Sequence, residues 1–226
     1  MNVVYQLNES AYRLGFWSAL VVALEVAVFA VTLLFPSAIT LSFIASFLLA
    51  PSFVALMLSI HYYAPPEKKI WSHLGLVFAI MYAVMCTINY FVQLAVVAGN
   101  PLQVSADALA LFTFMPGSAM FVVDMLGYSF MCLATLAVAP VFVGGRLERW
   151  LKGLFIAHGL LFAPTLIMTV IFPALSSGQR ASASVDIGAL VLLGWCAIFL
   201  PLPLLLAVMF GKLGRQETHA YERLGG

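Results

Sequence analysis

The chain has 226 residues, of which 64% are hydrophobic and only 8% are charged. Soluble globular domains carry about 25% charged residues, so this composition excludes an ordinary water-soluble domain and predicts that lipid is the main solvent. The formal net charge is +1 and no long basic run is present, which argues against a nucleic-acid-binding surface. No Cys-x-x-Cys pair, paired-histidine motif or phosphate-binding loop occurs, so we expect neither a metal site nor a cofactor.

The apolar residues fall into six stretches, each close to the roughly 20 residues that a helix needs to cross about 30 Å of hydrocarbon. A polar segment, residues 1–13, precedes them, and a polar tail, residues 211–226, follows them. The sequence therefore predicts an all-α integral membrane protein, with six transmembrane helices forming one bundle between residues 14 and 210. The predicted spans are 14–35, 38–60, 70–98, 119–143, 153–175 and 186–210.

Prolines and capping residues indicate where these helices end or bend. Pro36 ends the first span, because a proline disfavours the helical conformation of the residue before it. Pro51 and Pro164 lie inside the second and fifth spans, where a proline kinks a helix. Between the third and fourth spans, Ser105 is expected to cap a short helix, residues 106–114, that lies in the membrane interface.

Lysine and arginine sort by side of the membrane. Nine of the ten fall in segments on one side: the N-terminal segment has Arg13, the second-to-third loop has Lys68 and Lys69, the fourth-to-fifth loop has Arg146, Arg149 and Lys152, and the tail has Lys212, Arg215 and Arg223. Only Arg180 falls on the other side. The positive-inside rule therefore predicts that both termini are cytoplasmic and supports six spans. We expect the protein to lie in a plasma or inner membrane.

The third span carries a narrow polar stripe. Tyr82, Cys86, Asn89 and Gln93 recur at helical spacing on one face, whereas the opposite face is apolar and suited to lipid. Amides at this depth need a hydrogen-bonding partner, so the stripe is expected to face other helices.

Two carboxyl groups lie deep within the predicted spans, and a third, Asp186, lies at the outer boundary of the sixth. Glu25 is midway along the first span, and Asp124, which aligns with Tyr128, is in the outer third of the fourth. A bare carboxylate at the bilayer centre costs about 3 kcal/mol, and no span contains a lysine or arginine to pair with it. We therefore expect Glu25 to be protonated, or to bond to the polar stripe or to a water-filled cavity.

These residues predict a polar site that opens toward the outer face and binds or transports a small amphiphilic or cationic solute, in addition to contacts with membrane lipids. The expected binding residues are Glu25, Asn89, Gln93, Asp124, Tyr82 and Tyr128. A proton relay through Glu25, Asp124 and His158 would couple such binding to proton movement.

Two other functions stay open. A membrane enzyme acting on a lipid or isoprenoid would use Glu25, Asp124 or His158 as acid and base, and it predicts an elongated apolar pocket beside two titratable groups. An accessory or assembly subunit would use Asn89 and Gln93 only to bond helices together, and it predicts no cavity. The residues favour binding or transport over catalysis.

Overall fold

A computed structural model describes residues 2–101, 103–115, 117–171 and 185–223 of the chain. The described residues form helices and their connections, without a strand among them. Five segments of this part are helices long and apolar enough to cross a membrane. They are Glu9–Thr32, Ile39–Tyr63, Pro66–Val97, Ala119–Val141 and Leu190–Gln216.

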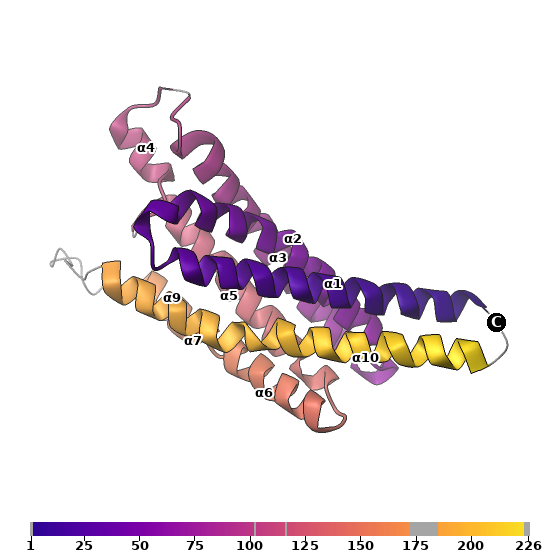
Figure 1. Cartoon of the computed structure of the whole chain (residues 1–226). Coiled ribbons are helices and arrows are strands. Elements are labelled where there is room, and N and C mark those ends of the chain that lie inside the picture. Colours follow the sequence, from indigo (N-terminus) through magenta and orange to yellow (C-terminus); the bar gives the residue numbers. More distant parts are fainter. Residues whose placement is uncertain (1, 102, 116, 172–184, 224–226) are drawn as a thin grey trace.

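Within the described ranges the helices follow one another with short connections, except around α4 (Figure 1). The 13 residues between Ile171 and Val185 lie outside the described part. Their bounds are α1 Asn2–Thr32, α2 Ile39–Tyr63, α3 Lys69–Val92, α4 Ala106–Phe112, α5 Ala119–Val138, α6 Arg146–Gly159, α7 Phe162–Leu166, α9 Val185–Phe199 and α10 Pro201–Arg223. A π-helical turn, Gln93–Val97, continues α3, and a second, Ile167–Ile171, continues α7.

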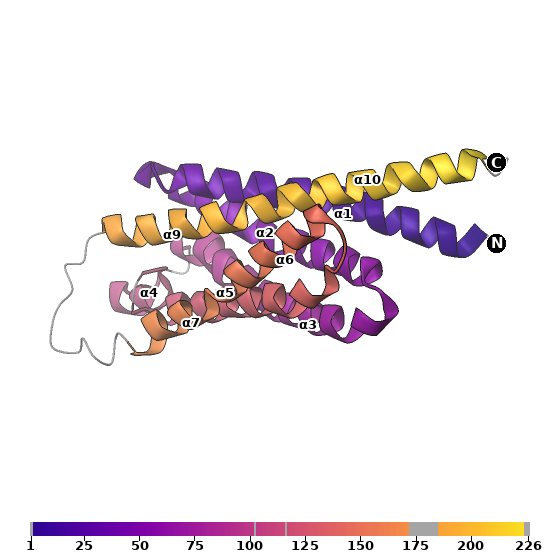
Figure 2. The ribbon, with the colours of Figure 1, turned by 90° about the horizontal axis from the view of Figure 1, so that it is seen from below.

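The most extensive helix contacts are those of α1 with α2 and α10, of α3 with α5, and of α2 with α3. Helices α9 and α10 together form one long rod beside α1, which runs in the opposite direction (Figures 1 and 2). Figure 2 shows both chain ends at the same end of the bundle, with α4 at the opposite end.

Glycines allow the closest helix crossings. A methyl group added to Gly159 of α6 would lie 2.9 Å from the Leu136 Cα atom of α5, and one added to Gly75 of α3 would lie 3.0 Å from the carbonyl oxygen of Ala134. Both distances are shorter than ordinary contacts, so α5 fits against α3 and α6 only because these positions have no side chain.

The helix expected between the third and fourth spans is confirmed. It runs from Ala106 to Phe112, and the Ser105 hydroxyl accepts a hydrogen bond from the backbone N–H of Ala108 at 3.4 Å. Helix α2 continues through Pro51 without interruption. Helix formation also extends beyond the predicted spans, because α1 begins at Asn2 and α10 continues to Arg223.

The fifth predicted span differs most from its expected form. Instead of one helix over residues 153–175, the chain forms α6, a turn at Leu160–Leu161, and then α7 with its π-helical turn. Pro164 explains the position of this break, because a proline ring clashes with the carbonyl four residues earlier, which here belongs to Leu160. Residues 172–175 of that span lie outside the described part.

Candidate functional site

Asp124 is the centre of a buried hydrogen-bond cluster between α3 and α5. Its Oδ1 atom accepts a hydrogen bond from Asn89 Nδ2 at 2.9 Å, and its Oδ2 atom accepts one from the Tyr90 hydroxyl at 3.2 Å. The Tyr90 and Tyr128 hydroxyl oxygens are 3.3 Å apart. The structure thus brings together three of the predicted binding residues, Asn89, Asp124 and Tyr128, through a fourth residue that was not predicted. Each carboxyl oxygen of Asp124 thus accepts a hydrogen bond from α3, and the side chain is buried.

Gln93 connects the end of α3 to the segment that follows α4. Its Nε2 atom donates to the Phe112 carbonyl oxygen at 2.7 Å, and its Oε1 atom accepts from the Phe114 backbone N–H at 2.9 Å. Phe114 also packs against Tyr90 and Phe121, with ring centroids 6.4 Å and 5.5 Å away. The Gln93 side chain therefore holds the α4 segment over the Asp124 cluster.

Glu25 lies apart from this cluster, at the contact between α1 and α2. Its Oε1 atom accepts a hydrogen bond from the Ser52 hydroxyl at 3.1 Å, whereas its buried Oε2 atom has no hydrogen-bonding partner among the described residues. Ser52 is not among the partners expected from the sequence. Tyr82 packs between the two regions, against Phe53 and Tyr128 at ring-centroid distances of 5.6 Å each, and its buried hydroxyl likewise has no hydrogen-bonding partner in the described part.

His158 is fully buried between α5 and α9. Its Nδ1 atom lies 2.8 Å from the Thr135 hydroxyl oxygen, and its ring packs against Phe199 and Trp195 with centroids 4.7 Å and 5.7 Å away. Neither Glu25 nor Asp124 contacts it in the described structure. Within the described residues, no three histidine, cysteine, aspartate or glutamate side chains group as metal ligands.

A partly enclosed cavity of about 430 Å³ lies between α1, α5, α7 and α9. Its walls are almost wholly apolar. The lining residues are Phe29, Met125, Tyr128, Cys132, Leu161, Pro164, Thr165, Val191, Leu192, Gly194, Trp195 and Ile198. Tyr128 therefore joins the two features, because it lines the cavity and its hydroxyl oxygen is 3.3 Å from that of Tyr90.

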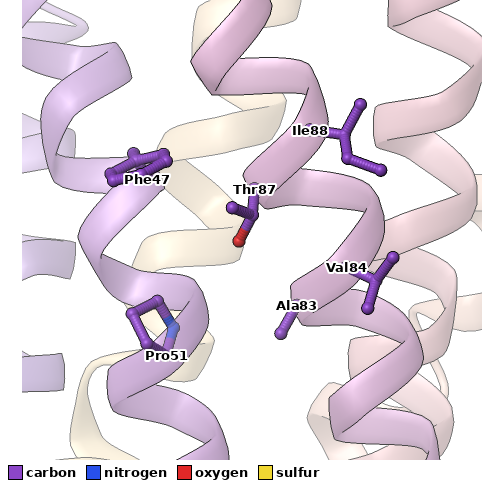
Figure 3. Close-up of a pocket in the computed structure, with 6 residues that line it drawn as sticks. All are labelled: Phe47, Pro51, Ala83, Val84, Thr87 and Ile88. Atoms are coloured by element: carbon purple, nitrogen blue, oxygen red, sulfur yellow. The ribbon is translucent and has the colours of Figure 1, made fainter.

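A second hollow, of about 420 Å³, opens on the outside of the bundle between α2 and α3. Phe47 and Pro51 form one side, and Ala83, Val84, Thr87 and Ile88 form the other (Figure 3). In Figure 3 the Thr87 side chain points into the space between the two helices. This hollow is more open than the cavity beside Tyr128.

Tyr90 and Trp195 are the main site residues that sequence reasoning missed. Tyr90 follows Asn89 directly and lies off the narrow stripe, although helix α3 buries both side chains. Trp195 could have been identified from the sequence. Tryptophan in membrane proteins concentrates at the interfaces, whereas Trp195 lies within the last apolar span.

The helices define the class of protein, which is an integral membrane helical bundle. Comparison of the chain with protein-family models, with curated proteins and with solved structures finds no match in any of the three. The function is therefore argued from the cavity and the polar clusters of this chain.

Proposed function

We propose that the protein is a six-span membrane protein that binds a small amphiphilic solute in the cavity between α5, α7 and α9. The observation that carries this proposal is the cavity itself. Small-molecule sites are mostly apolar hollows of about 300–1,000 Å³ with a few placed polar groups, and this cavity has that size and that lining. The apolar walls favour an amphiphilic solute over a cation.

The arrangement of the chain supports a sixth crossing and cytoplasmic termini. Helix α6, α7 and the π-helical turn after them supply a return between α5 and α9, and both chain ends lie at one end of the bundle (Figure 2). An even number of crossings follows from that arrangement, and the positive-inside rule then assigns the shared end to the cytoplasm. A fluorescent reporter that matures only in the cytoplasm is expected to fluoresce when fused to the C terminus.

The cavity lies in the half of the bundle away from the termini. Phe29 is close to the last residue of α1, Met125 is in the second turn of α5, and Val191 is in the second turn of α9. In the proposed orientation this half faces outward, which supports a site that exchanges its solute with the outer face or the outer leaflet.

The two alternative functions fit this cavity less well. Its lining contains neither a carboxyl group nor a histidine, so it lacks the acid and base that a lipid-modifying enzyme would place against its substrate. An accessory subunit that used polar groups only to bond helices together would have no need of an interior cavity.

Tryptophan quenching tests the proposal. A variant with Trp17, Trp71 and Trp150 changed to phenylalanine keeps Trp195 as its one tryptophan, since the chain has four. In detergent micelles, bromohexanol is expected to quench Trp195 along a saturable curve. Quenching that rises linearly with concentration would contradict the proposal, because it would indicate only partition into the micelle.

Two glycines provide a cavity-filling variant and its matched control. Gly194 of α9 lines the cavity, whereas Gly153 of α6 does not, and a methyl group added at either position would meet nothing within 4 Å. Gly194→Leu is therefore expected to remove saturable quenching, and Gly153→Leu to preserve it. With binding established, flux of the same probe in proteoliposomes decides whether the site also transports.

A further inference from the structure

Three of the residues that line the cavity carry aromatic rings. They are Phe29 of α1, Tyr128 of α5 and Trp195 of α9. Trp195 contacts both of the others, with ring centroids 6.4 Å from Phe29 and 5.4 Å from Tyr128. Rings from three separate helices thus meet at Trp195, and we call Phe29, Tyr128 and Trp195 the aromatic corner of the cavity.

Contacts outside the cavity hold the aromatic corner in place. Phe199 stacks on Trp195 with ring centroids 5.1 Å apart and ring planes 16° apart, and Phe199 itself is buried and is not among the lining residues. The Tyr128 ring packs against Tyr82, and its hydroxyl oxygen is 3.3 Å from that of Tyr90. Because these rings are already ordered, little conformational entropy is lost at the site when a ligand binds.

The angles between the ring planes favour one kind of ligand. The Trp195 plane is inclined by 87° to that of Phe29 and by 84° to that of Tyr128. A flat ring that lies parallel to Trp195 is therefore nearly perpendicular to the other two, and a ring parallel to either of those is nearly perpendicular to Trp195. Offset-parallel and perpendicular pairs are the arrangements that aromatic rings prefer, and they contribute beyond the burial of apolar area. An aliphatic chain fills the same space without that contribution.

We propose that the solute of this cavity is an amphiphile with an aromatic ring, which packs in the aromatic corner while the rest of the molecule fills the remaining space. This inference rests on the proposed function and names the class of its solute. A quaternary ammonium group is the other ligand that clustered aromatic rings recognise. The lining residues in the described part include no carboxyl group to balance such a charge, so the cavity favours an aromatic ring over a cation.

Three brominated probes test this inference by quenching the fluorescence of Trp195. Para-bromophenethyl alcohol, its saturated cyclohexyl analogue and bromohexyl trimethylammonium are titrated separately against the full chain that keeps Trp195 as its one tryptophan. Affinities are compared at equal mole fraction of probe in the micelle, so that differences in partition do not enter. The bromophenyl probe is expected to bind about fivefold more tightly than the bromocyclohexyl probe, since one aromatic pair contributes a factor of roughly two to ten. Burial of apolar area alone would not favour the phenyl ring, because the cyclohexyl ring has at least as much apolar surface.

Replacing Phe29 shows whether the aromatic corner is the source of the preference. In Phe29→Leu the preference for the bromophenyl probe is expected to fall to about half or less, because leucine keeps the wall apolar but forms no aromatic pair. Phe130→Leu is the matched control. Phe130 stacks on Phe78 between α3 and α5 and is not among the lining residues, so this change is expected to leave the preference as it is.

The outcomes separate failure of this inference from failure of the proposed function. Saturable binding of the bromophenyl and bromocyclohexyl probes with equal affinity would overturn the inference and leave the cavity as a binding site. Tighter binding of the trimethylammonium probe than of the bromophenyl probe would also overturn it, in favour of a cation. The absence of saturable quenching by every probe would overturn both proposals. The comparison of probes needs no change in the aromatic corner, so it stands even if Phe29→Leu does not fold.

Discussion

Replacing Asp124 with leucine tests whether the buried cluster holds α3 against α5. The substitution keeps a side chain of similar size but removes the acceptor for Asn89 at 2.9 Å and for Tyr90 at 3.2 Å. Side-chain hydrogen bonds between membrane helices average about 0.6 kcal/mol and reach about 1.7 kcal/mol. Losing two of them is therefore expected to lower the free energy of unfolding by about 1–3 kcal/mol.

Reversible unfolding in mixed micelles with increasing denaturing detergent measures this loss. Asp124→Asn, which keeps one acceptor oxygen, is expected to lower the free energy of unfolding by about half as much as Asp124→Leu does. Asp107→Asn is the control, since Asp107 is exposed in the first turn of α4. In a double-mutant cycle, Tyr90→Phe should cost less when Asp124 is already leucine. The reasoning is refuted if Asp124→Leu unfolds like the wild type, or if the two changes add without interaction.

Three other variants test separate contacts. Gly159→Ala is expected to destabilise the bundle by about 1–3 kcal/mol in the same unfolding assay, because the added methyl group meets the α5 backbone at Leu136, whereas Gly153→Ala should not destabilise it. Gln93→Leu is expected to speed hydrogen exchange of the Phe114 amide at least about tenfold, since that N–H loses its acceptor; unchanged exchange would mean that Gln93 does not hold the α4 segment. Glu25→Gln is expected to change the free energy of unfolding by no more than about 0.6 kcal/mol, because the amide oxygen still accepts from Ser52, and a larger loss would show that the charge itself is used.

Hydropathy predicted five of the six spans, since composition alone determines which segments can lie in lipid; the fifth predicted span, residues 153–175, is not among the described helices long and apolar enough to cross. Helical periodicity predicted the polar stripe of the third span. Tyr82, Cys86, Asn89 and Gln93 recur at helical spacing in the sequence, and all four are buried in the structure. Ser105 likewise marked the start of α4 correctly, because an N-cap is a local signal that depends only on neighbouring residues.

Partner choice was less predictable, because it depends on how helices are rotated and stacked. Glu25 was expected to be protonated, or to bond to the third-span stripe or to a water-filled cavity. Its hydrogen-bonding partner in the structure is instead Ser52, because α1 packs mainly against α2 and α10. The break in the fifth predicted span was easier to predict, because its cause is local. Pro164 was expected to kink this span. The structure instead interrupts the helix at Leu160, whose carbonyl is the one that the Pro164 ring would clash with in a continuous helix.

The cavity is a better guide to function in this bundle than the buried charged groups are. Asp124 is the most conspicuous polar residue of its span, yet each of its carboxyl oxygens accepts a hydrogen bond from α3, one from Asn89 and one from Tyr90. His158 is likewise fully buried, against Thr135, Trp195 and Phe199, and it is not among the residues that line the cavity. Buried polar groups with such contacts stabilise the packing of helices, whereas an apolar hollow of about 430 Å³ has space for a solute. Saturable probe binding that depends on the Asp124 carboxylate but survives Gly194→Leu would therefore reverse this assignment, and it would return the site to the α3–α5 contact.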